Sequence, residues 1–173
     1  MTRIAAAVLA LAVPLAPAAA LADAHVGMRV TGVIVDREGA EIGSVEVFET
    51  ASGVVRVNVA ASPIPAGGHG VHFHEIGECE GDFTSAGEHI AGGMEHGLVE
   101  GGPHPGDMPN GFVEVEALNY ETFNAAISVG EHLLDEDGAA LMIHSAPDDY
   151  ESQPSGDAGD RIACAVLQEA PAG

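Results

Sequence analysis

Seven potential metal ligands in three short clusters constrain the fold of this chain more than any other feature. The first cluster lies in the segment HGVHFH, the second in the stretch that follows it, and a single histidine comes far downstream. The residues are His72 and His74; His89, His96, His104 and Asp107; and His144. Seven ligands are enough for two adjacent metal ions, so a fold that uses them must bring the three clusters to one place.

The spacing within the clusters indicates what each could bind. His72 and His74 are two residues apart, so on a strand their imidazoles point to the same face and can bind one ion. The next stretch, residues 75–110, is rich in glycine and too irregular for a strand or helix, and long loops of this kind are usually functional. Its three imidazoles and one carboxylate are typical of a structural zinc site, whereas an all-imidazole group suits copper.

Five segments in a fixed order resemble the copper,zinc superoxide dismutases. They are HGVHFHEIGEC, SAGEH, HPGD, ALMIH and GDRIACAV, and the resemblance runs from about residue 30 to residue 167. Each motif alone is weak, but the ordered combination is specific. The resemblance implies an oxidoreductase that converts superoxide to dioxygen and hydrogen peroxide, with one copper ion and one zinc ion per subunit.

The resemblance also implies which residues bind each metal. It assigns four residues to copper, namely His72, His74, His89 and His144. It assigns four to zinc, namely His89, His96, His104 and Asp107. His89 would therefore be shared, and its ring would bridge the two ions. His96 follows His89 by seven positions, about one fewer than is common in the family, and a loop can absorb this difference.

Two further residues match family positions outside the ligand set. Asp148 corresponds to a carboxylate that accepts hydrogen bonds from one ligand of each metal, here His72 and His96, and such a partner fixes the orientation of each ring. Arg161 corresponds to the guanidinium that orients the anionic substrate beside copper, a task that suits a planar cation with several donors. The resemblance thus makes Arg161 and His89 the catalytic residues.

The remaining histidines are interpreted as structural or surface residues, because a single histidine in a domain is more often one of these than a ligand. They are His25, His69 and His132. His69 lies three residues from His72, so on an extended strand it faces away from the pair. We expect it to be a hydrogen-bonded packing residue.

The N-terminal segment has the features of a secretory signal peptide. Arg3 precedes an apolar run over residues 4–13, and small residues follow as far as Ala22-Asp23-Ala24. We predict a signal peptide over residues 1–24 and one domain over residues 25–173, although cleavage after Ala22 fits the same pattern. The apolar run is too short to span a bilayer, so we expect no membrane span. An export signal of this kind predicts the bacterial periplasm or, failing that, the extracellular space.

The two cysteines are expected to form a disulfide, because thiols in an exported protein meet an oxidising compartment. Cys79 lies in the glycine-rich loop and Cys164 in the last apolar run. The family pattern has its own disulfide at these positions. A bridge here would tether the loop to the rest of the fold.

Short runs rich in Val, Ile, Phe and Thr predict an all-β fold. Eight runs are separated by Gly, Pro, Asn and Asp, at residues 29–35, 45–49, 54–59, 71–74, 112–116, 122–129, 139–144 and 162–167. This pattern favours an antiparallel sandwich or barrel. The resemblance implies a flattened eight-stranded antiparallel Greek-key barrel with two long functional loops, and the second loop corresponds to residues 145–160.

The chain is strongly acidic, with 27 Asp and Glu against five Arg, no Lys and a formal charge of −22. This charge argues against nucleic acid as a partner, and it should repel an anionic substrate at long range. An alternative function is a periplasmic buffer that binds copper and zinc on the same fold without turnover. Arg161 argues against it, because a storage protein needs no anion guide. The sequence leaves open whether the protein is a homodimer.

Overall fold

Alternating apolar and polar residues build the strands that form the core of this protein. The strand β3 (Val55–Ala61) shows the pattern clearly, because Val55, Val57 and Val59 are buried whereas Arg56 is exposed. Residues two apart on a strand share a face, so one face of β3 packs into the core and the other meets solvent.

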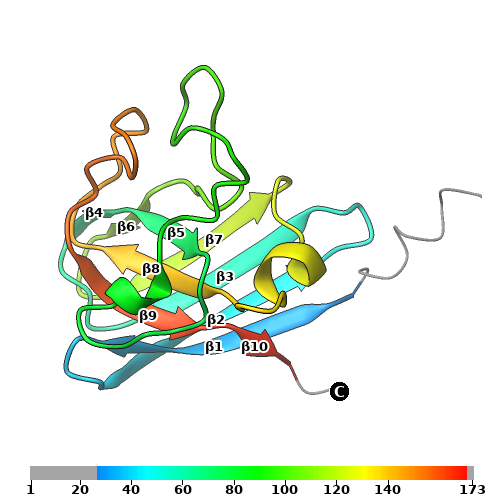
Figure 1. The fold of residues 1–173 in the computed structure, drawn as a ribbon. Coiled ribbons are helices and arrows are strands. Elements are labelled where there is room, and N and C mark those ends of the chain that lie inside the picture. The colour runs from blue at the N-terminus through cyan, green and yellow to red at the C-terminus, as the bar shows by residue number, and fades with distance from the viewer. Residues whose placement is uncertain (1–26, 171–173) are drawn as a thin grey trace, which may run out of the picture.

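The computed structural model describes residues 27–170, which form an all-β fold (Figure 1). The predicted signal peptide, residues 1–24, and His25 lie outside the described residues. The remaining strands are β1 (Arg29–Asp36), β2 (Glu41–Glu49), β4 (Gly67–His69), β5 (Val71–His74), β6 (Gly111–Val113), β7 (Leu118–Asn124), β8 (Ala140–His144), β9 (Arg161–Val166) and β10 (Gln168–Glu169). A 3₁₀ turn covers Thr84–Ala86, and a π-helix covers Val129–Leu133.

Eight strands form one antiparallel sheet that curls into a half-barrel (Figure 1). Its order is β5-β8-β9-β1-β2-β3-β7, with β10 paired to β1, and β4 and β6 form a separate two-stranded sheet. The all-β prediction is confirmed. The predicted strand at residues 122–129 is displaced, because β7 ends at Asn124, where the side-chain oxygen accepts hydrogen bonds from the backbone N–H groups of Ala126 and Ile127 and turns the chain.

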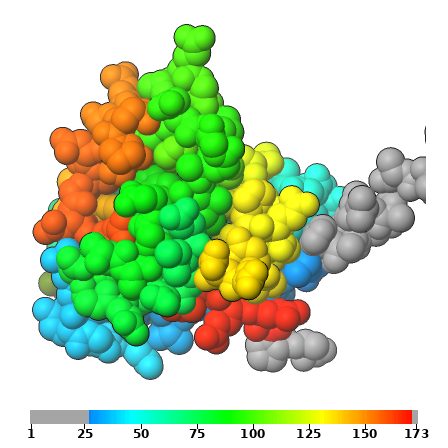
Figure 2. Space-filling model, viewed as in Figure 1, coloured from blue at the N-terminus to red at the C-terminus, as the bar shows by residue number. Residues whose placement is uncertain are grey.

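Two long connections match the predicted loops. The first loop (residues 75–110) joins β5 to β6, and the second loop (residues 145–160) joins β8 to β9. The two loops lie side by side at one end of the sheet, and their surfaces touch in the space-filling view, where the first loop is green and the second is orange (Figure 2). Residues far apart in the sequence therefore meet at this end.

The strand β8 carries buried residues on both faces. Leu141 and Ile143 pack into the main core, whereas Met142 packs on the opposite side against Phe83 and Cys164. The second side is covered by the part of the first loop near the 3₁₀ turn. The strand that ends in His144 is thus enclosed on both faces, which fixes the position of this histidine.

Core packing in this fold can be tested on β7, where Leu118 is 1% exposed and Phe123 is 65% exposed. We expect Leu118→Ala to lower the free energy of unfolding by about 2–5 kcal/mol, because it leaves a cavity in the main core. The measurement is urea unfolding followed by circular dichroism. The control is Phe123→Ala on the same strand, which should change stability by about 0.5 kcal/mol or less because its side chain faces solvent. Equal losses in both variants would contradict the packing described here.

Candidate metal centre

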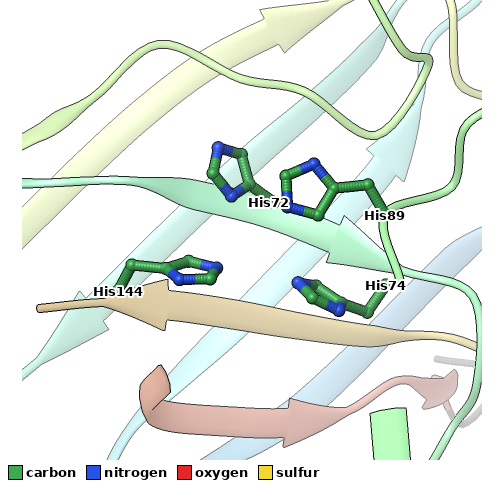
Figure 3. A group of neighbouring side chains, drawn as sticks. All are labelled: His72, His74, His89 and His144. Carbon is green, nitrogen blue, oxygen red and sulfur yellow. The ribbon is translucent and has the colours of Figure 1, made fainter. Parts of the chain in front are cut away.

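Strand pairing brings His72, His74 and His144 together. β5 carries His72 and His74 and pairs with β8, which ends at His144, so all three rings converge above the two strands (Figure 3). The intervening Phe73 is fully buried in the main core, as the alternation of side chains on a strand requires. The predicted HxH geometry is therefore confirmed.

Backbone hydrogen bonds fix the first loop against β5. The N–H of Phe73 donates to Gly106 O, the N–H of Ile90 donates to Phe73 O, and the N–H of Gly106 donates to Ile90 O, all at 2.9 Å. These three bonds hold the segments that carry His89 and Asp107 beside the HxH pair.

The first group of potential ligands consists of His72, His74, His89 and His144. All four are buried, and one ligand atom from each lies within 4.8 Å of the others. The rings of His72 and His89 are closest, with centroids 4.1 Å apart. Figure 3 shows the four rings facing a common centre.

The second group consists of His89, His96, His104 and Asp107, whose ligand atoms also lie within 4.8 Å of one another. The carboxylate of Asp107 lies at its centre, 2.9 Å from His89 Nδ1, 3.1 Å from His96 Nδ1 and 3.3 Å from His104 Nδ1. The shorter spacing between His89 and His96 does not displace His96 from the group. His89 belongs to both groups, which is the arrangement that the family resemblance implies.

The buried ring nitrogens test whether metal ions fit these two groups. Within the described residues, six of them have no hydrogen-bond partner: His72 Nδ1, His74 Nε2, His89 Nε2, His96 Nδ1, His104 Nδ1 and His144 Nε2. Buried polar atoms are normally satisfied, so each exception needs an explanation. Metal ions supply one, because neutral imidazole nitrogens are common ligands of both copper and zinc.

The opposite nitrogen of several rings is fixed by the protein, as is usual for metal-binding histidines. His74 Nδ1 donates to Gly87 O at 3.0 Å, and His144 Nδ1 donates to Gly159 O at 3.3 Å. His72 Nε2 donates to Asp148 Oδ2 at 2.8 Å, and His96 Nε2 donates to Asp148 Oδ1 at 3.1 Å. These four bonds leave His72 Nδ1, His74 Nε2, His96 Nδ1 and His144 Nε2 directed at the two centres.

Asp148 therefore contacts one histidine of each group, which is the arrangement that the family resemblance implies. It is 3% exposed and is enclosed by Gly156, which has a φ of 67°. A Cβ at Gly156 would lie 2.7 Å from His96 Nε2 and would overlap the carboxylate of Asp148. Glycine is required here by both the left-handed backbone and the close approach.

Burial keeps three imidazoles of the first group neutral. Desolvation is the largest cause in each case, and it lowers the pKa of His72 to about 4, of His144 to about 3 and of His74 to about 2. Burial raises the pKa of Asp107, but hydrogen bonds from His89 and the backbone of Gly97 outweigh it and leave that pKa well below its usual value. At neutral pH these three histidines offer neutral imidazoles and Asp107 offers a carboxylate, which are the protonation states that metals bind.

Arg161 lies beside the first group, and its guanidinium is held by two backbone carbonyls. One terminal nitrogen donates to Phe83 O and the other to Gly87 O, each at 2.7 Å. Gly87 O also accepts the hydrogen bond from His74 Nδ1. The positive charge of Arg161 contributes to the lowered pKa of both His74 and His144, after burial and neighbouring histidines.

The expected disulfide is present and joins Cys79 of the first loop to Cys164 of β9. It fastens the segment that supplies the carbonyls of Phe83 and Gly87 to the sheet. His69 also agrees with the prediction of a packing role, because it is 1% exposed and its ring contacts His144 O at 2.7 Å and Pro65 O at 2.8 Å. His132 accepts a hydrogen bond from the N–H of Ser128 at its Nδ1.

Comparison with known proteins places this centre in a family. The family model described as copper/zinc superoxide dismutase matches residues 41–167. The chain belongs to this family. Among the described residues of this superoxide dismutase family member, no helix is long and apolar enough to cross a membrane.

Two bacterial relatives and one solved bacterial structure are similar to this family member over most of its length. Superoxide dismutase [Cu-Zn] 2 of Aquifex aeolicus is 44% identical over 147 residues, covering 78% of this chain and 84% of that protein. Superoxide dismutase [Cu-Zn] of Caulobacter vibrioides is 37% identical over 148 residues, covering 80% and 84%. The crystal structure of a superoxide dismutase-like protein from Bacillus subtilis superposes with a TM-score of 0.75 at 34% identity, covering 80% of this chain and 97% of that one.

Two side-chain amides with clear contacts to the site were not predicted. Asn110 Nδ2 donates to Asp148 O and its Oδ1 accepts from the N–H of Asp148, both at 2.8 Å. Gln153 makes the same kind of paired contact with the backbone of His96. Neither residue belongs to a ligand motif, and only the folded arrangement of the two loops reveals them.

The lowered pKa values predict that the metal-free protein loses stability in mild acid. The folded-state pKa of His72, about 4, lies below its ordinary value of 6.5. Stability is therefore full above pH 6.5, where His72 is neutral in both the folded and the unfolded protein. It is lost as the pH falls toward 4, because the unfolded protein then binds a proton at His72 that the folded protein does not. Each histidine of this kind lowers the free energy of unfolding by up to about 1.4 kcal/mol for every pH unit in this window. Urea unfolding of the metal-free protein at pH 7.5, 6 and 5 measures the effect, and equal stability at all three would contradict it.

Proposed function

We propose that this protein converts superoxide to dioxygen and hydrogen peroxide at a copper ion joined through His89 to a zinc ion. Membership of the superoxide dismutase family makes superoxide the substrate. The observation that supports the metal pair best is the position of His89. It is the residue common to the two ligand groups, with Nε2 on one side of its ring and Nδ1 on the other.

The proposed copper ligands are His72, His74, His89 and His144, and the proposed zinc ligands are His89, His96, His104 and Asp107. The four imidazoles of the first group suit copper, whereas three imidazoles and a carboxylate suit structural zinc. When bound, copper would supply the one-electron chemistry of both half-reactions, and zinc, which has no redox role, would hold the ring of His89. One ion of each kind per subunit fills the two groups.

Arg161 and His89 have distinct tasks in this proposal. The guanidinium of Arg161 orients superoxide, because its charge and planar donors suit a small oxyanion. In the first half-reaction one superoxide loses its electron to the metal site and leaves as dioxygen, and His89 takes up a proton from solvent water at Nε2. In the second half-reaction another superoxide gains the electron, receives this proton and one from water, and leaves as hydrogen peroxide.

We further propose that the protein is exported to the periplasm after loss of residues 1–24, with residues 25–173 as the mature domain. The signal-like N-terminal sequence supports this, and so does the disulfide, which is typical of oxidising compartments. The alternative of a non-catalytic copper and zinc buffer is less well supported, because the position of Arg161 beside the first group serves no purpose in storage.

Activity of the metal-loaded protein tests the proposal directly. The assay is inhibition of dye reduction by xanthine oxidase, with Arg161→Ala and His144→Ala as variants. We expect Arg161→Ala to retain both metals but to lose about tenfold or more in rate, because the anion is no longer attracted and oriented. His144→Ala should lose copper and nearly all activity. A buffer protein would bind both metals and show no activity in the unmodified form.

The distribution of charge leads to a prediction about salt. Arg29 and Arg56 pair with Glu46 and Glu121 on the outer face of the sheet, with N–O distances of 3.3 and 2.7 Å. Arg161 instead faces the first group of histidines. The attraction of superoxide to Arg161 therefore acts over a short range, whereas the repulsion of superoxide by the net charge of −22 acts over a longer one.

We expect superoxide dismutation to be slower in dilute buffer and to rise, or at least not to fall, as salt is added. Screening acts over about 8 Å at physiological ionic strength, so salt weakens distant repulsion more than the attraction of Arg161 nearby. The measurement is the second-order rate constant by pulse radiolysis at several salt concentrations. A steep decline in the rate constant with salt would contradict this, because it would mean that positive charge around the site attracts superoxide at long range.

A further inference from the structure

The segment around His96 is held by contacts that the ligand set does not explain. Three consecutive backbone N–H groups donate hydrogen bonds across the site: His96 N to Gln153 Oε1 at 2.9 Å, Gly97 N to Asp107 Oδ2 at 2.9 Å, and Leu98 N to Tyr150 O at 2.7 Å. Two of the three acceptors belong to the second loop. The second loop thus fixes the backbone of this part of the first loop by hydrogen bonds.

Gln153 makes the most specific of these contacts. Its Oε1 accepts from the N–H of His96, and its Nε2 donates to the carbonyl oxygen of the same residue at 2.8 Å. Nε2 also donates to Glu151 O at 3.2 Å, which anchors the amide within its own loop. One side chain therefore satisfies both backbone polar groups of His96, and this pair fixes the backbone position of the residue.

The chain leading to His96 is held by the N–H of Met94 to Ala91 O at 3.0 Å and the N–H of Glu95 to Gly101 O at 3.1 Å, but these bonds do not reach the backbone of His96 itself. Gly92 and Gly93 precede it, with φ values of 57° and 74°, and adjacent glycines permit many backbone conformations. The side chain of His96 is fully buried, and its ring is oriented by Asp148. Ring orientation and backbone position thus depend on two different residues of the second loop, Asp148 and Gln153.

The contacts of Gln153 distinguish it from Asp148. Asp148 contacts His72 of the first group and His96 of the second. The hydrogen bonds of Gln153 reach His96 and Glu151. A change at Gln153 should therefore affect the second group alone.

We propose that Gln153 is a positioning residue for the zinc site. By fixing the backbone of His96, Gln153 keeps His96 Nδ1 directed toward His104 and Asp107. The assignment of zinc to this group rests on the proposed function. The expectation that a change at Gln153 affects the second ligand group and not the first does not rest on it. Loss of an outer partner of a metal ligand typically weakens metal binding by 10–100-fold. Because Gln153 acts through the backbone, we expect an effect near the lower end, about tenfold.

Two substitutions distinguish the two hydrogen bonds between the side chain of Gln153 and the backbone of His96. Gln153→Leu removes both hydrogen bonds while keeping a side chain of similar size. Gln153→Glu keeps an acceptor for the N–H of His96 but places a carboxylate against its carbonyl oxygen, so it should be intermediate at neutral pH. The control is Ser155→Ala, a change two residues further along the same loop.

The decisive measurement is metal affinity of the full-length mature protein. Metal-free samples are titrated separately with zinc and with copper against a competing chelator, and cobalt(II) absorption reports the geometry of the second group. We expect the zinc dissociation constant to rise about tenfold in Gln153→Leu and less in Gln153→Glu. Copper affinity should be unchanged in all variants, and Ser155→Ala should match the unmodified protein.

Two results would overturn the proposal. One is a zinc affinity in Gln153→Leu within twofold of the unmodified protein. The other is an equal loss of zinc and copper affinity, which would indicate general destabilisation and not positioning. Saturating zinc should restore activity in Gln153→Leu. If the unmodified protein binds both metals but lacks dismutase activity, the proposed function fails while the affinity measurements still decide the role of Gln153.

Discussion

The carboxylate of Asp148 is the contact on which the arrangement of the metal centre depends. Its two oxygens accept hydrogen bonds from His72 and His96, so one buried side chain orients a ring in each ligand group. Burial alone would favour its neutral form, but these bonds and one from the backbone N–H of Tyr150 lower its pKa. The charged carboxylate then holds both rings in the tautomer that leaves His72 Nδ1 and His96 Nδ1 for metal ions.

The position of Asp148 depends in turn on how the two loops bind each other. Asn110 of the first loop holds the backbone of Asp148, and Gln153 of the second loop holds the backbone of His96. Each loop thus supplies an amide that fixes a residue of the other. Apart from the 3₁₀ turn at Thr84–Ala86, the two loops have no helix or strand, so these reciprocal bonds and the disulfide hold them in place of the hydrogen-bond ladder that orders a sheet.

Much of this arrangement could be predicted from the sequence, and the parts that could not share a physical cause. Alternation on a strand places His72 and His74 on one face, and motif order identifies His89, His144 and Asp148. The short strands β4 and β10 were missed, because two or three residues are too few to show an alternating pattern and Gly67, Gly68 and Glu169 have little strand propensity. Asn110 and Gln153 were missed because an amide that binds a distant backbone leaves no periodic signal in the sequence.

The carbonyl of Gly87 links Arg161, the proposed anion guide, to His74, a proposed copper ligand. It accepts hydrogen bonds from both Arg161 and His74, within a segment that the Cys79–Cys164 bridge fastens to β9. The guanidinium cannot swing aside without breaking a contact shared with the histidine. An incoming oxyanion therefore meets a receptor whose conformational freedom was removed when the chain folded, and little further ordering of the protein is needed at the moment of encounter.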